Sequence, residues 1–232
     1  MLVDAHVHTF VFDEFPPGER WAFANRWGWM APPVEKAARR PLLPAREQRR
    51  GPFRDVGSCC ARAGAVVADP EGEVLFKYMD SLGVDKAVAM MIDWGIAWGE
   101  ESAFGIEQVN AHAGELTKKY PGRYYFCLGV DPRRRTAADI AEKGIRDHGA
   151  VGIKLMGANG FALDDPICFP IYEIANAHDV PIVMHTGTGD VAANVQLAHP
   201  WRIEKPAKIF PTLQFVLAHA GGGLDGLWRD VL

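Results

Sequence analysis

Short apolar runs alternate with amphipathic segments along most of the chain. The apolar runs predict strands buried on both faces, and apolar residues spaced three or four positions apart predict helices. The predicted strands are 2–8, 85–93, 124–131, 151–157, 181–187 and 214–222. The predicted helices are 73–83, 104–120, 136–149, 165–179 and 199–210, and a last helix is expected to begin near Leu224.

This order predicts parallel strands joined by right-handed helical crossovers. Both an α/β barrel and an open doubly wound sheet would produce it. No G-x-G-x-x-G sequence opens the first helix, which argues against a dinucleotide-binding fold. We therefore expect an α/β protein with about six strand–helix units.

Residues 10–65 follow a different pattern, rich in tryptophan and proline, with a strongly basic run at 36–50. We interpret them as an insertion after the first strand that packs on the mouth of the fold. A substrate lid and an oligomer contact are the alternatives. The basic run is most simply a solvated face, although it would also attract an acidic substrate.

Composition narrows the class of protein. The chain has 232 residues, of which 48% are hydrophobic, and a net charge of −4. This is enough for one core and one domain over 1–232, and it argues against nucleic-acid and membrane partners. No apolar run approaches the ~20 residues of a membrane span, and no secretory signal opens the chain, so we expect a cytoplasmic protein. The cysteines lack C-x-x-C spacing and are interpreted as thiols, with Cys127 and Cys168 in the core.

Histidines gather at the ends of predicted strands. His6 and His8 are two positions apart, so in a strand their side chains share a face. His185 and His219 each end a later apolar run. Because active sites of β/α barrels form at the C-terminal ends of the strands, these four imidazoles are expected to meet in one mouth and to favour a divalent metal. Asp4 is expected to share the face of His6 and to orient a histidine.

The other histidines have ordinary explanations and are not expected to bind metal. They lie at predicted helix ends, within a helix or in a loop, at positions 112, 148, 178 and 199. Lys154 lies within an apolar strand, where an unpaired ammonium is costly. It is interpreted as an anchor for a substrate carboxylate, as a carbamylated metal ligand, or as a lysine that reaches solvent.

Four segments, DAHVH (4–8), VGIKLMG (151–157), IVMHTG (182–187) and FVLAHAGG (215–222), resemble the amidohydrolase superfamily. Within it they resemble the amidohydrolase-2 branch, which includes aminocarboxymuconate-semialdehyde decarboxylase-like enzymes. The resemblance covers most of the chain outside 10–65 and implies a TIM-type (β/α)8 barrel with one divalent metal, zinc or else manganese. It also implies His6, His8 and His185 as metal ligands, and His219 as the base that holds and deprotonates the metal-bound water.

The chain departs from this family in its length. A complete barrel takes ~250 residues, whereas only six units are predicted, and no segment supplies the aspartate expected at the eighth strand. We therefore expect strands seven and eight to be missing, through truncation or because another chain covers the gap. Four aspartates that follow predicted strands are candidates to replace the absent one: Asp93, Asp131, Asp190 and Asp225.

The sequence leaves the reaction open. The first hypothesis is a hydrolase, in which metal-activated water attacks a small, carboxylate-bearing substrate. The alternatives are non-oxidative decarboxylation of an unsaturated or aromatic carboxylate, and a catalytically silent fragment that acts as a binding or assembly module. A phosphotriesterase-like binuclear site with carbamylated Lys154 is a further alternative. A homo-oligomer is left open.

Overall fold

The structure is a computed structural model that describes residues 1–7, 69–99, 101–187 and 194–222. The predicted insertion at 10–65, His8, Asp190, and the helix expected from Leu224 with its Asp225 lie outside these residues. The single-domain organisation predicted for 1–232 stays a prediction for that reason.

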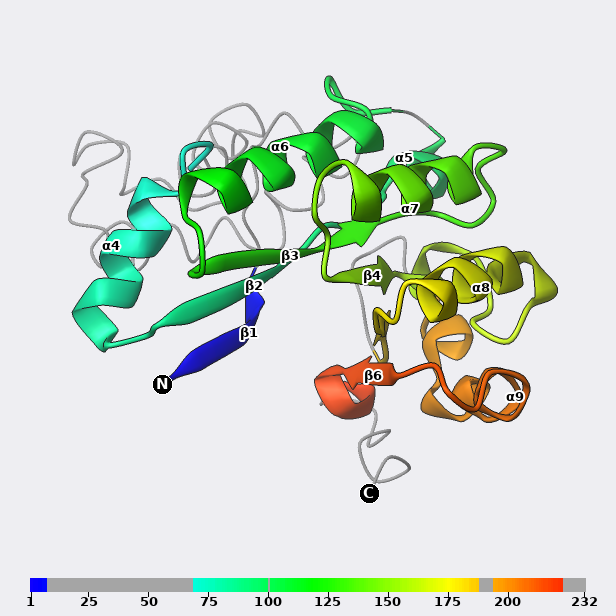
Figure 1. Ribbon diagram of the computed structural model, residues 1–232. Coiled ribbons are helices and arrows are strands. Elements are labelled where there is room, and N and C mark those ends of the chain that lie inside the picture. Colours follow the sequence, from blue (N-terminus) through cyan, green and yellow to red (C-terminus); the bar gives the residue numbers. More distant parts are fainter. Residues whose placement is uncertain (8–68, 100, 188–193, 223–232) are drawn as a thin grey trace, which may run out of the picture.

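All six predicted strands are present and run parallel in one sheet, in the order β1-β2-β3-β4-β5-β6. Each strand therefore pairs with its neighbours in the sequence, as in a barrel built from consecutive strand–helix units. The sheet curls into part of a barrel, with β1 and β6 at its two edges (Figure 1). The predicted α/β barrel architecture is confirmed for these strands, which are β1 (Val3–Val7), β2 (Lys86–Met90), β3 (Tyr124–Gly129), β4 (Gly152–Leu155), β5 (Ile182–His185) and β6 (Phe215–Ala218).

Helices connect the strands and cover the convex side of the sheet, where α6, α7 and α8 lie in Figure 1. The predicted helix at 199–210 is divided into a 3₁₀ turn, Pro200–Ile203, and a short helix, because Pro206 lacks the N–H that a continuous helix needs. The α-helices of the described residues are α4 (Glu73–Leu82), α5 (Gly95–Trp98), α6 (Ile106–Lys119), α7 (Ala137–Arg146), α8 (Phe169–Ala177) and α9 (Glu204–Ile209).

Alternation along each strand separates two faces of the sheet. Ile153 and Leu155 of β4 belong to the main core, which lies between the sheet and the helices. Lys154 lies between them in sequence and therefore faces the concave side. A small apolar cluster lies on that inner face, made of Val88, Met90, Cys127, Val183 and Ala218. The barrel interior is thus apolar around a single buried lysine within the described residues.

Strand β1 departs from simple alternation. Its pairing with β2 shifts between Asp4, which aligns with Ala87, and Val7, which aligns with Ala89. Ala87 and Ala89 both belong to the outer core. Asp4 therefore aligns with the outer face, and the expectation that it shares a face with His6 is wrong. Its carboxylate instead accepts the backbone N–H of His6 at 3.2 Å.

One further expectation is met in the described residues. Cys127 and Cys168 are free, buried thiols, as predicted for core positions. Within the same residues, no helix combines the length and apolar character needed to cross a membrane. Thr136 precedes α7 at its N-cap position, and its side chain makes no capping hydrogen bond.

Candidate functional site

The curled sheet brings three of the four predicted site histidines together. His6 belongs to β1, His185 ends β5, and His219 follows β6 directly. The ring centroid of His219 lies 4.7 Å from that of His6 and 4.7 Å from that of His185. The rings of His6 and His185 are therefore within twice that distance of each other. His8, the remaining predicted ligand, lies outside the described residues.

Burial keeps the imidazoles of His6 and His219 uncharged. Desolvation lowers the pKa of His6 from 6.5 to about 4, and the nearby Lys154 and His219 lower it further than Asp4 can raise it. Burial also lowers the pKa of His219, again with a contribution from Lys154. Both rings are thus neutral at pH 7, which is the form that binds a metal or accepts a proton.

The donor set fits a divalent metal in its chemistry, because neutral imidazoles from separate strands converge on one rim. Within the described ranges alone, no group of three or more histidine, cysteine or acidic side chains has the arrangement of a complete metal site. The predicted set of His6, His8 and His185 includes one residue outside those ranges. Its role as a metal site therefore stays a proposal.

Lys154 is the charged group of the barrel interior. Its side chain is 1% exposed, and its Nζ has no hydrogen-bond partner among the described residues. The prediction that it reaches solvent is therefore wrong. Burial lowers the pKa of this ammonium to about 8, so it still carries its charge at pH 7. A buried cation without a partner favours binding of an anion.

Cys127 packs beside Gly152, on the same face of the sheet as Lys154. A Cβ at Gly152 would lie 2.8 Å from Cys127 Sγ, so glycine is required for the thiol to fit beside β4. Burial raises the pKa of the Cys127 thiol to about 12, although Lys154 opposes the shift. Cys127 is therefore an uncharged part of the apolar lining, and it does not neutralise the ammonium.

Two candidate replacements for the missing aspartate are engaged in ion pairs. Asp131 accepts two hydrogen bonds from the Arg133 side chain, at 2.9 and 2.6 Å. Asp93 accepts two from Arg134, at 2.5 and 2.7 Å, and one from the backbone N–H of Asp131 at 2.9 Å. Both carboxylates are buried. The hydrogen bonds of these two carboxylates join the loop after β2 to the loop after β3. Their arginine partners account for the burial of both carboxylates without a metal.

Sequence reasoning missed the arginine partners of these aspartates. Their signal is local, because Asp131-Pro-Arg-Arg-Arg135 directly follows a buried strand. Arg133 also donates to the carbonyl oxygen of Asn159 at 3.0 Å, and Arg134 donates to Glu101 at 2.7 Å. The arginines thus extend the network to the loop after β4 and to the segment before α6.

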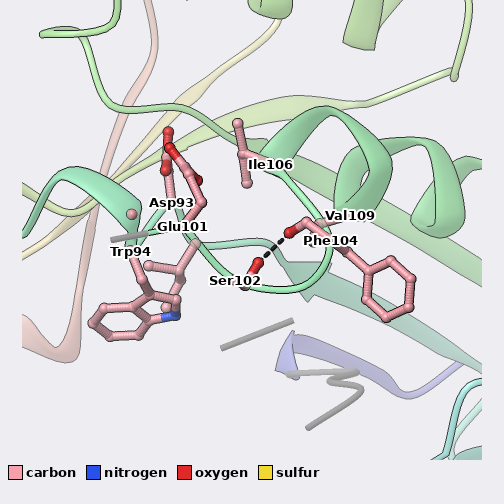
Figure 2. Close-up of a pocket in the computed structure, with 9 residues that line it drawn as sticks. Asp93, Trp94, Glu101, Ser102, Phe104, Ile106 and Val109 are labelled. Carbon is pink, nitrogen blue, oxygen red and sulfur yellow. Dashed lines mark hydrogen bonds between the residues drawn. The ribbon is translucent and has the colours of Figure 1, made fainter. Parts of the chain in front are cut away.

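Asp93 also lines a pocket, whose lining residues Figure 2 draws as sticks. The hydroxyl of Ser102 donates to the carbonyl oxygen of Phe104 at its edge. None of the clustered histidines lines this pocket, and neither does Lys154, so it is separate from the candidate site. Its lining residues are Ile92, Asp93, Trp94, Gly95, Glu101, Ser102, Phe104, Ile106 and Val109.

The remaining described histidines make their contacts with helices and loops. His112 of α6 contacts the carbonyl oxygen of Pro70, and His178 contacts Glu142 at 2.9 Å. Nδ1 of His199 accepts the backbone N–H of Trp201. His148 packs beside Gly114 of α6. Each of these positions is accounted for by helix and loop packing.

Solved structures support the barrel assignment. The chain is similar to an uncharacterized TIM-barrel protein from Bordetella bronchiseptica, at 18% identity and a TM-score of 0.63, over 99% of this chain and 70% of that one. It is similar to 5-carboxyvanillate decarboxylase from Novosphingobium aromaticivorans, solved with manganese and 4-hydroxy-3-methoxy-5-nitrobenzoic acid, at 17% identity and 0.63, over 100% and 68%. It is also similar to 4-oxalomesaconate hydratase from Rhodopseudomonas palustris, at 18% identity and 0.57, over 100% and 67%.

These similarities to solved structures establish the fold. The family is established by a match of the sequence to a family model. Nothing among the curated proteins matches the chain. A family model described as amidohydrolase matches residues 73–232, well over half of the chain. The match includes β4, β5 and β6, whose ends carry Lys154, His185 and His219. The protein therefore belongs to the amidohydrolase family, in the amidohydrolase-2 branch that its strand-end histidines resemble.

Proposed function

We propose that this protein is a metal-dependent enzyme that acts on a small carboxylate-bearing substrate, and that its reaction is non-oxidative decarboxylation. The observation that carries the proposal is the buried ammonium of Lys154 inside an apolar barrel, beside the histidine rim. An anionic substrate would remove the cost of leaving that cation unpaired. Two proteins of similar fold support this substrate class, since one is named a decarboxylase bound to a benzoic acid and the other a hydratase of an oxalomesaconate.

His6, His8 and His185 would hold the metal, with zinc or manganese as the candidates. Manganese is present in the similar decarboxylase structure. When bound, such an ion supplies Lewis-acid stabilisation of negative charge on the substrate. The neutral state of His6 supports this role, because a protonated imidazole has no lone pair for a metal.

Lys154 would bind an anionic oxygen of the substrate. A carboxylate that leaves as CO2 loses its charge, so a cation paired with it would stabilise the ground state more than the transition state. We therefore assign Lys154 to an oxygen that stays on the product, such as a phenolate or a second carboxylate. There its charge would also stabilise the electrons left behind by the departing CO2.

His219 would move the proton. It lies at the rim with part of its surface exposed, and it is neutral, so it can take a proton from water or from the substrate and deliver it to carbon as CO2 leaves. The same side chain supports the second candidate, hydrolysis, in which His219 removes a proton from attacking water. Both reactions use the same five residues, and the substrate's chemistry decides between them.

The test is turnover by the full chain supplied with Mn²⁺ or Zn²⁺. The decarboxylation panel is 5-carboxyvanillate and hydroxylated benzoates, followed by release of CO2, and the hydrolysis panel is anilides and esters of the same acids. We expect CO2 release that is abolished by Lys154→Met and His219→Gln and unaffected by Lys118→Met. Hydrolysis without CO2 release would select the second candidate. The absence of both turnover and metal binding would overturn the proposal in favour of the silent binding module.

A further inference from the structure

The turn that carries His219 has an unusual backbone conformation. His219 and Ala220 follow β6 with φ angles of 66° and 45°. These angles lie in the left-handed region, which residues with a side chain seldom occupy. The direction of the His219 ring therefore depends on a backbone conformation that this dipeptide disfavours, so the surrounding structure has to hold it.

Thr186 makes hydrogen bonds to both sides of this turn. It directly follows His185 and is fully buried. Its Oγ1 donates to the carbonyl oxygen of Ala218 at 2.6 Å, and the backbone N–H of Gly221 donates to the same Oγ1 at 2.9 Å. The hydroxyl thus links the residue before His219 to the turn's last residue, and it uses both its donor and its acceptor capacity.

The backbone next to Thr186 also approaches the turn closely. The N–H of Thr186 donates to the carbonyl oxygen of Ala218 at 3.2 Å. Gly187 has a φ of 98°, and a Cβ there would lie 2.4 Å from the backbone of Gly221. The ends of β5 and β6 are therefore in direct backbone contact beside the threonine hydroxyl.

We propose that Thr186 is the positioning residue for His219: its hydroxyl holds the left-handed turn and thereby keeps the His219 ring against that of His185. This inference rests on the proposed function, in which His219 moves the proton. Thr186 acts through His219 and has no contact of its own with the reacting atoms. A displacement of about 1 Å at a proton-transfer group costs up to ~100-fold in rate, so the hydroxyl matters to turnover.

The test compares three variants of the full chain. Thr186→Val keeps the shape and loses the hydroxyl, whereas Thr186→Ser keeps the hydroxyl. Thr117→Val is the matched control, because the Thr117 hydroxyl donates to the carbonyl of Ala113 within α6, far along the chain from the site. The first measurement is the nuclear Overhauser effect between the His185 and His219 ring protons, which needs neither metal nor substrate.

We expect Thr186→Val to lose the effect between the two rings, and Thr186→Ser and Thr117→Val to keep it. With a substrate that wild type turns over, we expect kcat to fall by roughly 10- to 100-fold in Thr186→Val with KM changed by less than about threefold. Thr186→Ser should recover kcat to within about threefold of wild type. Recovery of kcat by serine would show that turnover depends on the hydroxyl of residue 186 and not on how its side chain packs.

Three results would overturn the inference. They are retention of the ring-to-ring effect in Thr186→Val, its equal loss in the valine and serine variants, and an unchanged kcat in Thr186→Val. If Thr186→Val does not fold, Ala220→Gly is added to relieve the left-handed turn, and the same criteria apply to the double variant. Because the magnetic resonance result is independent of turnover, an inactive wild type would count against the proposed function and leave this inference to be decided on its own.

Discussion

His6 and His219 come from opposite edges of the sheet, and yet their ring centroids lie 4.7 Å apart. Four strands separate β1 from β6 in the order of the sheet. In a flat sheet this would place the rings roughly 20 Å or more apart, since neighbouring strands are ~4.8 Å apart. The contact is therefore direct evidence that the sheet closes toward a barrel, and it places the candidate site across the opening.

Removal of the His6 or the His185 imidazole should abolish metal binding. We expect the full chain to bind about one equivalent of Zn²⁺ or Mn²⁺, and His6→Gln or His185→Gln to reduce this to background, because glutamine does not replace an imidazole donor. Metal content after dialysis, measured by mass spectrometry, is the readout. His178→Gln is the control, since His178 pairs with Glu142 on the outer surface. Full metal content in both site variants would contradict the assignment, and two bicarbonate-dependent equivalents would favour carbamylated Lys154.

Lys154 should destabilise the fold at neutral pH. The unfolded chain holds this proton up to about pH 10.5, whereas the folded chain releases it near pH 8. The unfolded state therefore binds more protons between these values, and stability rises with pH across that window. We expect Lys154→Met to raise the free energy of unfolding by about 3 kcal/mol at pH 7, and by less than about 1 kcal/mol at pH 10.

Urea unfolding at the two pH values measures this difference. Lys118→Met is the control, because Lys118 is an exposed lysine of α6 and should show little change at either pH. An equal gain from Lys154→Met at pH 7 and pH 10 would show that packing, and not the buried charge, causes the effect.

Breaking the Asp93–Arg134 pair should be costly. Arg134→Met leaves a carboxylate that is 2% exposed without its guanidinium, and we expect the free energy of unfolding to fall by about 3 kcal/mol. The double variant with Asp93→Asn should recover part of this loss, since the amide oxygen can still accept the N–H of Asp131. Denaturant titration is the measurement. The exposed pair of Lys208 and Glu204 is the control, and Lys208→Met is expected to leave the free energy of unfolding nearly unchanged.

Gly187→Ala should lower the free energy of unfolding far more than Gly83→Ala, the same substitution at another glycine of positive φ. Both Gly187 and Gly83 have positive φ, but a Cβ at Gly83 meets nothing within 4 Å. We expect Gly83→Ala to cost about 1 kcal/mol through backbone strain, and Gly187→Ala to cost more than about 3 kcal/mol because the contact with Gly221 is added. Thermal unfolding of both variants provides the comparison, and similar losses would show that the β5–β6 contact yields easily.

Local pattern was sufficient to predict the strands and the direction of their side chains. Alternation placed Lys154 opposite Ile153 and Leu155, and the structure has it there, because successive side chains of any regular strand point to opposite faces. The same rule failed for Asp4, where the register of β1 shifts against β2. That irregularity depends on how the two strands pair, and the sequence of β1 carries no sign of it.

The sequence by itself determined the order of strands and helices, the family, and the placement of imidazoles at strand ends, because these depend on short-range periodicity and local motifs. Only the tertiary structure decided which groups meet. It closed the sheet to bring His6 to His219, paired Asp93 with Arg134, and set Thr186 across the turn of β6. Such contacts join residues up to 213 positions apart, as for His6 and His219, and their distances follow from the curvature and packing of the whole sheet, which no single segment encodes.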